Sequence, residues 1–201
     1  MNWFAATVLA TAASAFVSGV WWSSIRRRSG IRPMARDPLT GTANRTWVLR
    51  YLRSELARAA RSGRVVGVAF CDIDAFKEVN DGHGHLAGDL VLVAVAQHLR
   101  SALRPADVVA RFGGDEFIVV CGGLDSCDDM AAIGDRLRKA ASDLSLSHNA
   151  HLSDGVIRVT TSIGTATGRG GEVTPEDLIA SADRSMYRHK RLLDRSAVNV
   201  S

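Results

Sequence analysis

A short run of almost entirely apolar residues at 65–71, VVGVAFC, constrains the fold more than any other feature of this chain. Its β-branched and aromatic side chains are typical of a strand that is buried on both faces. Such a strand belongs in the middle of a sheet. Because the run is followed by Asp72 and Asp74, the sequence also predicts carboxylates at one end of the central strand.

Two further strand-like runs follow at 108–112 and 117–121, and the sequence GGDE at 113–116 separates them. Two glycines can adopt positive φ angles without steric cost, so we expect a β-hairpin turn here. In a β-α-β-β order the first strand commonly lies beside the hairpin. The acids at the two tips would then converge.

The remaining elements are predicted from apolar spacing and capping signals. A Gly- and His-containing loop is expected at 81–88 and a strand at 156–166, and residues 197–200 are a candidate edge strand. Helices are expected at 44–60, 89–103, 126–144 and 174–189. The order is β-α-β-β-α-β, which predicts an α+β, ferredoxin-like core with an antiparallel sheet and helices on one face.

Residues 3–22 form a 20-residue stretch without a charged side chain. As a helix it would be about 30 Å long, the thickness of a bilayer core. Trp3 at one end and Trp21 and Trp22 at the other suit the two interfaces, and the arginines at 26–28 place that side in the cytoplasm. We therefore expect a single-pass anchor at 1–25 in the inner or plasma membrane. A basic juxtamembrane linker and entry turn (26–43) and a cytoplasmic domain (44–201) would follow.

Two alternatives exist for this stretch. A cleaved signal peptide would use the small residues at 10–15 as its cleavage site. However, no Lys or Arg precedes the apolar run and the basic cluster follows it, the wrong polarity for export. A buried core helix would not need tryptophans at both ends and three arginines beside it. A retained anchor explains these features best.

The net charge of +4 is unevenly distributed along the chain. Residues 1–36 contain five arginines and no acid, which leaves 20 basic and 21 acidic residues beyond them. The domain is therefore near neutral, which argues against nucleic acid as a partner. Cys71, Cys121 and Cys127 include no CxxC pair, so neither a disulfide scaffold nor a structural zinc site is expected.

The four acids at the two predicted tips point to a cation site. Like charges a few ångström apart raise each other's pKa unless a cation neutralises them, and hard oxygen ligands suit magnesium. The alternative is that acids near strand ends are simply solvated turn residues. One Asp-x-Asp sequence alone would favour that alternative, but two acidic tips in this topology support a cation site equally well.

At this point the motifs carry a resemblance. RFGGDEF at 111–117 matches the signature of GGDEF-domain diguanylate cyclases, and four further blocks agree with the family in order and spacing. These blocks are DPLTG with NR at 37–45, DIDAFK with ND, GH and GD at 72–89, TSIG at 161–164, and AD, MY and K at 182–190. The resemblance spans Asp37 to Lys190, nearly the whole predicted domain.

The resemblance implies an enzyme that joins two GTP molecules into cyclic di-GMP and releases two pyrophosphates. Each subunit of a homodimer would hold one GTP. Two Mg²⁺ ions, or Mn²⁺ in their place, would be held by the Asp72 carboxylate, the Ile73 carbonyl and the Asp115 carboxylate. Asp115 is the acid that the family treats as catalytic, and Glu116 would support the turn.

The resemblance also implies how GTP would be bound. Asn80 and Asp89 would bind the guanine edge, because a carboxylate accepts hydrogen bonds from both guanine donors and adenine leaves it unpaired. Alternatively, Asp89 is an acid that stabilises a helix N-terminus, and both roles can hold at once. The phosphates would be approached by two lysines and by the backbone of the turn glycines: Lys77, Lys190, Gly113 and Gly114.

The resemblance also implies an inhibitory site for the product, and the chain departs from the family pattern at one position near its end. Arg104 and Asp107 form the family's Arg-x-x-Asp at the matching distance before the signature, and Arg136 would be a second arginine that binds cyclic di-GMP. Asp194 stands where the family usually has an arginine that reaches phosphate. This departure supports an alternative, a weak or inactive GGDEF-like domain that binds GTP or cyclic di-GMP as a sensor or interaction module.

Overall fold

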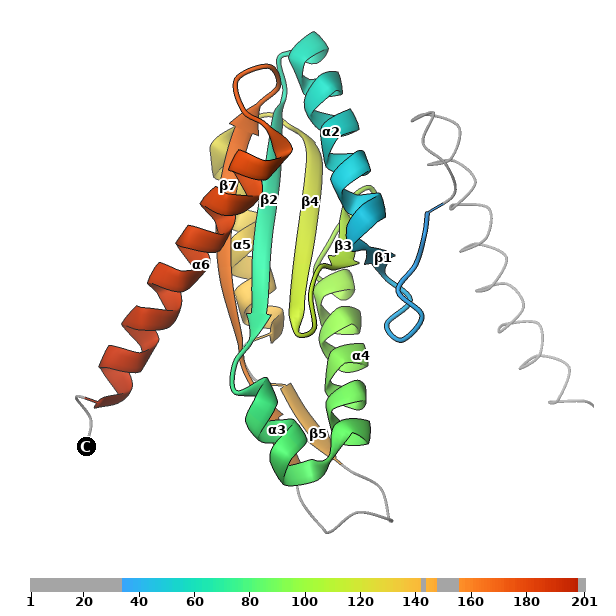
Figure 1. The fold of residues 1–201 in the computed structure, drawn as a ribbon. Coiled ribbons are helices and arrows are strands. Elements are labelled where there is room, and N and C mark those ends of the chain that lie inside the picture. The colour runs from blue at the N-terminus through green and yellow to red at the C-terminus, as the bar shows by residue number, and fades with distance from the viewer. Residues whose placement is uncertain (1–33, 142–143, 148–155, 199–201) are drawn as a thin grey trace, which may run out of the picture. The chain divides into compact units, whose positions relative to one another are not determined.

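A five-stranded sheet, with strand order β1-β3-β4-β2-β7, organises the part of the chain that follows residue 34 (Figure 1). The computed structural model describes residues 34–141, 144–147 and 156–198. The predicted anchor at 1–25 and the linker as far as residue 33 lie outside the described residues. Within the described ranges, no helix has the length and hydropathy needed to cross a bilayer.

The strands and helices have the following bounds. The strands are β1 (Ala43–Asn44), β2 (Val65–Ile73), β3 (Val108–Arg111), β4 (Glu116–Leu124), β5 (Leu144–Ser147), β6 (Val156–Val159) and β7 (Thr161–Arg169). The helices are α2 (Arg45–Ser62), α3 (Phe76–His83), α4 (His85–Ser101), α5 (Cys127–Ala141) and α6 (Pro175–Val198).

The predicted core order is confirmed. Strand β2 lies between β4 and β7 and is antiparallel to both, and β3 is antiparallel to β4. Elements β2, α4, β3, β4, α5 and β7 therefore form the β-α-β-β-α-β unit. Every residue of β2 except Asp72 is buried, as its apolar sequence predicts for a central strand.

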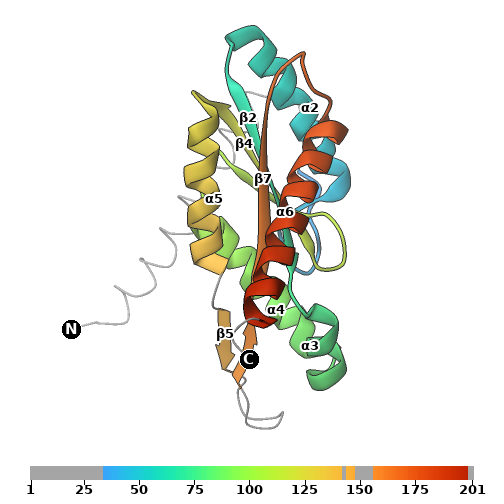
Figure 2. The same ribbon diagram turned by 90° about the vertical axis from the view of Figure 1, so that its left-hand side faces the viewer.

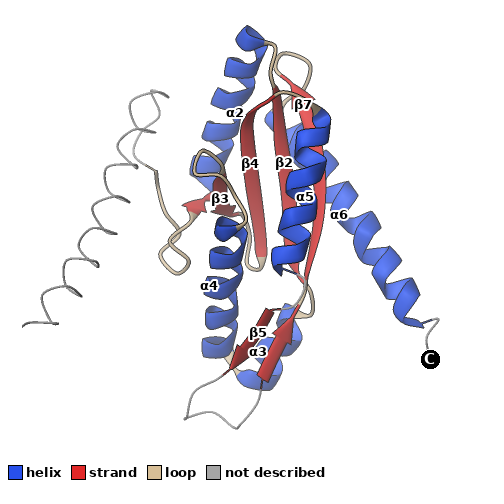
Figure 3. Ribbon diagram, turned by 180° about the vertical axis from the view of Figure 1, so that it is seen from behind, coloured by secondary structure: helices blue, strands red, loops and turns tan. Residues whose placement is uncertain are grey.

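The prediction that the helices of the core lie on one face of the sheet is confirmed, and helices outside the core cover the other face. Helices α4 and α5 pack on one face, and α2 and α6 pack on the other (Figures 2 and 3). Helices α2 and α6 lie outside the β-α-β-β-α-β unit, and each has an apolar stripe that needs a partner surface. Leu52 and Leu56 of α2 and Leu178 and Ala182 of α6 are buried there.

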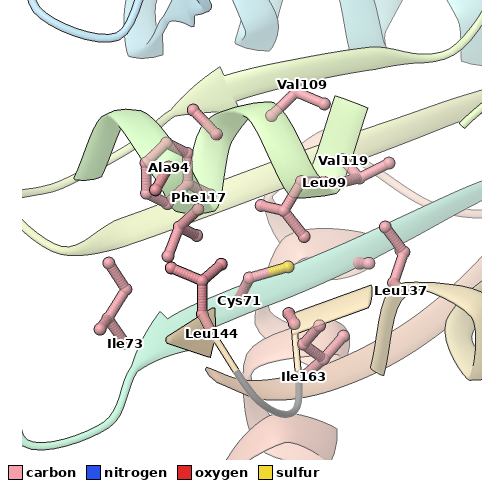
Figure 4. Packing of buried hydrophobic residues seen from close by; sticks show 14 of the residues in the cluster. Cys71, Ile73, Ala94, Leu99, Val109, Phe117, Val119, Leu137, Leu144 and Ile163 are labelled. Carbon is pink, nitrogen blue, oxygen red and sulfur yellow. The ribbon is translucent and has the colours of Figure 1, made fainter. Parts of the chain in front are cut away.

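The larger hydrophobic core lies between the sheet and the α4–α5 layer (Figure 4). Alternate residues of β2 and β4, including Cys71 and Phe117, meet Leu99 of α4 and Leu137 of α5. This alternation follows from the two-residue period of a strand. Cys71 is buried and makes no disulfide, so it packs as a small apolar residue.

The predicted loop at 81–88 is mostly helical. Helix α3 continues to His83, and α4 begins at His85. The single break falls at Gly84, whose φ of 82° is open to glycine at little cost. Asp89 therefore lies in the second turn of α4, and the idea that it is a helix N-terminal acid is not supported.

Three predicted boundaries were also wrong. The strand expected at 156–166 is divided, because β6 pairs with β5 in a separate two-stranded sheet while β7 joins the main sheet. Helix α5 ends at Ala141, and Leu144 begins β5. Helix α6 continues to Val198, so Ala197 and Val198 are helical and form no edge strand; residues 199–200 lie outside the described residues.

Both predicted capping signals are present. The Asp129 carboxylate accepts from the backbone N–H of Ser126 at 3.0 Å, and the Ser126 hydroxyl accepts from that of Asp129 at 3.4 Å. The Thr174 hydroxyl accepts from the backbone N–H of Asp177 at 3.1 Å, immediately before α6. These bonds satisfy amide groups that a helix leaves unpaired at its start.

Close packing of α6 on β7 depends on Gly164. A Cβ at this position would lie 1.9 Å from the Met186 nitrogen and 2.4 Å from the Ala182 oxygen, both backbone atoms that cannot rotate away. We expect Gly164→Ala to lower the free energy of unfolding by about 1–3 kcal/mol, as overpacked cores do. Urea denaturation measures this change.

Gly82→Ala is the matched control for this variant, since nothing lies within 4 Å of a Cβ at Gly82 and alanine favours helix. Equal unfolding midpoints for Gly164→Ala and the unmodified chain would contradict the close approach.

Candidate active site

The acidic tips of β2 and of the β3–β4 hairpin converge, as the sequence predicts. Asp72 pairs with Glu116 in the register of β2 and β4. One step further, the Ile73 N–H donates to the Asp115 backbone oxygen at 3.3 Å. Asp72, Ile73 and Asp115 are therefore neighbours at one end of the central strand pair.

Negative charge is concentrated at this end of the sheet. The pKa of Glu116 is raised, first by partial burial and then by the charges of Asp115, Asp72 and Asp183, while Arg45 opposes the shift. Asp183 lies on α6 and was not among the predicted site residues. A cation placed here would relieve this repulsion.

Lys190 of α6 reaches this acidic end and supplies one positive charge. Its Nζ lies 2.5 Å from Asp72 Oδ1 and 3.5 Å from Asp74 Oδ1. Partial burial would lower the pKa of Lys190, but the hydrogen bond and charge of Asp72 and the charge of Asp74 outweigh it, so the pKa is raised. The lysine stays charged at neutral pH.

Asp74 has a different set of partners from Asp72. It accepts hydrogen bonds from the hydroxyls of Thr160 and Ser162, both at 2.7 Å, and its own N–H donates to the Thr160 oxygen at 3.0 Å. Asp74 thus ties the end of β2 to the start of β7. Sequence reasoning grouped Asp74 with the acidic tips but did not predict this anchoring, because Thr160 lies 86 residues away.

The turn between β3 and β4 is held by Arg111. Its Nε and Nη2 donate to the Gly114 oxygen at 3.1 and 2.7 Å, and its Nη1 lies 3.5 Å from Asp37 Oδ2. A Cβ at Gly113 would meet Glu116 Oε2 at 2.2 Å, so the Glu116 side chain would have to move, and neither Gly113 nor Gly114 takes the positive φ that the sequence suggested. Gly114 is exposed at the tip.

Asp37 connects the entry segment to the turn. Its Oδ1 accepts from the Thr40 N–H and hydroxyl, both at 2.8 Å. Partial burial would raise the pKa of Asp37, but the Thr40 hydrogen bonds and the Arg111 charge outweigh it and lower the pKa. The sequence motif DPLTG signalled this segment, but its contact with the turn is visible only in the structure.

A second contact joins α2 to the turn. The Arg45 guanidinium carbon lies 4.5 Å from the centroid of the Phe112 ring, and Phe70 packs edge-on against the same ring at 5.9 Å. A guanidinium over an aromatic face is an attractive arrangement. Sequence reasoning noted Arg45 only as part of a motif.

Helices α3 and α4 bring Asn80 and Asp89 to neighbouring positions. A Cβ at Gly88 would lie 2.1 Å from Asn80 Oδ1, so the absence of a side chain at Gly88 lets the amide of Asn80 lie against α4. Asp89, the next residue, is exposed, and so is Lys77 on α3. The two predicted guanine-binding residues therefore lie on adjacent helices, with Asp89 exposed and Asn80 partly buried.

The predicted product-site residues also come together. Arg104 donates from its backbone N, Nε and Nη2 to the carboxylate of Asp107 at 3.1–3.2 Å, and the Asp107 side chain is fully buried. Arg136 of α5 is exposed and donates from Nε to the Ala102 oxygen at 3.2 Å. Both arginines thus flank the turn before β3.

The donor set fits a hard cation in part. Within the described ranges, no group of three or more His, Cys, Asp or Glu side chains could hold a metal unaided. The carboxylates of Asp72 and Asp115 and the Ile73 carbonyl are the hard oxygen ligands that Mg²⁺ or Mn²⁺ prefers. Substrate phosphates would supply the remaining oxygen ligands.

Comparison with known proteins agrees with this geometry. A family model described as diguanylate cyclase, GGDEF domain, matches residues 34–194. The diguanylate cyclase DgcP of Pseudomonas aeruginosa is 40% identical over 155 residues, which are 77% of this chain and 22% of that protein. The diguanylate cyclase TpbB of the same species is 39% identical over 156 residues, 77% of this chain and 35% of that protein.

A solved structure is also similar. The GGDEF domain of DgcB from Caulobacter crescentus, crystallised in complex with c-di-GMP, has a TM-score of 0.71 at 30% identity and covers 80% of this chain and 92% of that one. This chain spans only about a fifth to a third of the length of the curated relatives DgcP and TpbB. The family match extends over most of the chain, and the acidic tips, the turn and the fold are all in place: this chain belongs to the GGDEF-domain diguanylate cyclase family.

Proposed function

We propose that this chain condenses two GTP molecules into cyclic di-GMP and two pyrophosphates, with one GTP held by each subunit of a homodimer. The observation that carries the proposal is the convergence of Asp72, Ile73 and Asp115 at one end of β2 and β4 in a chain of this family. A single site of this kind binds one GTP, so a ring built from two nucleotides requires two facing sites.

The reaction consists of two identical phosphoryl-transfer steps, in each of which a phosphoanhydride bond of GTP is replaced by a phosphodiester bond. The 3′-hydroxyl of one GTP loses its proton to solvent, its oxygen bonds to the α-phosphorus of the other GTP, and the bond from that phosphorus to the bridging β-phosphate oxygen breaks to release pyrophosphate. Divalent ions at Asp72, Ile73 and Asp115, Mg²⁺ or Mn²⁺, would polarise the phosphate and lower the pKa of the hydroxyl. Lys190 and Lys77 would bind the outer phosphates, and the turn glycines let backbone approach them.

Asp115→Asn tests the enzymatic proposal. Loss of one charged ligand removes several kcal/mol of transition-state stabilisation, so cyclic di-GMP formation should fall at least about 100-fold. Product is measured from GTP and Mg²⁺ with the full 201-residue chain purified in detergent. Asp125→Asn, which removes an exposed carboxylate that pairs with Arg64, is the matched control and should retain activity.

Absence of cyclic di-GMP from the unmodified chain, even after it is fused to a dimerising partner, would refute the enzymatic proposal.

Guanine selectivity is proposed to reside in Asn80 and Asp89. Guanine presents adjacent N1–H and N2–H₂ donors, and an exposed carboxylate can accept from both. The amide of Asn80, held against α4 beside Gly88, would complete recognition of the edge. Adenine offers an acceptor at N1, which would leave the carboxylate unpaired.

Asp89→Asn should raise the KM for GTP about 10- to 100-fold, because it removes hydrogen bonds to a charged acceptor worth about 1.5–3 kcal/mol. Steady-state rates over a GTP series measure this change. Glu78→Gln is the control, since Glu78 is exposed and points about 200° around α3 from Asn80. An unchanged KM in Asp89→Asn would place guanine recognition elsewhere.

Product inhibition is proposed at Arg104, Asp107 and Arg136. Guanidinium groups suit both phosphate and the guanine edge. The buried carboxylate of Asp107 holds Arg104 in one orientation, and Arg136 enters the same region from α5. Cyclic di-GMP bound there would inhibit its own synthesis.

A second candidate function is a sensor that binds GTP or cyclic di-GMP without catalysis. Asp194, four residues beyond Lys190 on α6, replaces the usual arginine and favours this candidate. A sensor predicts that Asp115→Asn keeps the full biological output of the protein. Loss of output together with loss of product would exclude it.

Membrane anchoring through residues 1–25 is also proposed, with the domain on the cytoplasmic side of the inner or plasma membrane. The charge-free stretch at 3–22 and the arginines that follow it support this proposal. We expect the chain to remain in bacterial membranes after carbonate extraction, and a variant without residues 1–25 to be released. Release of the unmodified chain, or a shortened N-terminus, would contradict the anchor.

A further inference from the structure

The turn that carries Arg104 and Asp107 rests on helix α2. The Tyr51 hydroxyl of α2 donates to the Ala106 oxygen, in the middle of this turn, at 3.4 Å. The ring of Tyr51 is buried and stacks on Trp47, with centroids 5.0 Å apart and planes 12° apart. The hydroxyl is therefore held in place by a packed ring.

The carboxylate of Glu55 lies one turn further along α2 and acts on the same hydroxyl. Burial, followed by the charge and hydrogen bond of Glu55, raises the pKa of Tyr51, so its hydroxyl keeps its proton at neutral pH. The charge of Glu55 thus acts on the hydroxyl that donates to the Ala106 carbonyl.

Glu55 is an unusual residue to find in this position. Its side chain is only 4% exposed, and its Oε1 lies 2.9 Å from Arg58 Nη1 but makes no hydrogen bond within the described part of the chain. Its Oε2 lies so close to β4 that a Cβ at Gly122 would meet it at 2.4 Å. The Gly122 oxygen in turn accepts from Arg104 Nη2 at 3.4 Å.

These contacts lie far from the acidic tips. Gly122 is six residues beyond Glu116 on β4, which is about 20 Å at roughly 3.3 Å per residue. A change at Tyr51 or Glu55 can therefore affect the Arg104–Asp107 turn without touching the residues proposed to bind GTP. Helix α2 also begins directly after the entry segment at 37–44, so it connects that segment to the turn that carries Arg104 and Asp107.

We propose that Tyr51 and Glu55 are positioning residues for the Arg104–Asp107 turn and that helix α2 thereby sets the affinity for cyclic di-GMP at the inhibitory site. Tyr51 holds the Ala106 carbonyl, and Glu55 weakens that hold by competing for the proton. The inference rests on the proposed product inhibition and assigns its control to α2.

The test compares single and double variants of the full 201-residue chain. Tyr51→Phe keeps the stacked ring and removes the donor, so the inhibition constant for cyclic di-GMP should rise about 3- to 10-fold. Glu55→Gln keeps the shape and removes the charge, so Tyr51 turns to Ala106 and the constant should fall about 2- to 3-fold. In the double variant the constant should match that of Tyr51→Phe alone.

The kcat and the KM for GTP should stay within about 2-fold in all three variants. General loosening of the fold would instead change these constants together with the inhibition constant. Arg53→Ala is the matched control, because Arg53 lies on the exposed side of α2 and forms a surface ion pair with Glu176. Cyclic di-GMP affinity is also measured by calorimetry, which applies whether or not the chain is catalytically active.

The possible outcomes distinguish failure of the positioning role of α2 from failure of the proposed product inhibition. If Arg104→Ala leaves both inhibition and cyclic di-GMP binding unchanged, the proposed inhibitory site is wrong. If Arg104→Ala weakens them but Tyr51→Phe and Glu55→Gln do not change them, α2 does not position the turn. If Tyr51→Phe and Glu55→Gln both weaken them, the competition for the Tyr51 proton is refuted. Should Tyr51→Phe fold poorly, Glu55→Gln alone still decides between these results.

Discussion

The pairing of β2 with β4 is the constraint on which the rest of this structure depends. Its register sets Asp72 opposite Glu116 and brings the Ile73 N–H to the Asp115 oxygen. A slip of one residue would turn every side chain of β2 to the opposite face and separate the acids. Both faces of β2 are buried, so such a slip would force every one of its side chains to repack against a different layer of helices. The hydrophobic core and the acidic site are thus held by one strand pair.

Charge balance at this site depends on an element outside the central unit. Helix α6 is held against β7 by the backbone contact at Gly164, and this contact lets Lys190 reach Asp72 and Asp74. Thr160 and Ser162 complete the partners of Asp74. The pKa of Glu116 is raised first by partial burial and then by the charges of Asp115, Asp72 and Asp183, so the lysine leaves repulsion between the acids at the two tips. The remaining negative charge is the physical reason to expect divalent cations together with substrate.

Local signals predicted most of the elements well. The glycine pair in the turn, the capping residues before α5 and α6 and the apolar run of β2 all specify structure within a few residues. The α3–α4 region was predicted poorly, because glycine and histidine near Gly84 suggested a loop where one glycine breaks two helices. The full length of α6 was also missed, since the residues at 197–200 suggested an edge strand where Ala197 and Val198 continue the helix.

The sequence by itself determined the order of strands and helices, the acidic tips and the family, because hydrophobic period, turn residues and motif spacing are local properties. Tertiary structure alone decided which distant groups meet. Lys190 lies 118 residues from Asp72, and Tyr51 lies 55 residues from Ala106. Such contacts depend on how α6 and α2 pack across the second face of the sheet. That packing is set by the fit of buried side chains and backbone, which no local pattern in the sequence records.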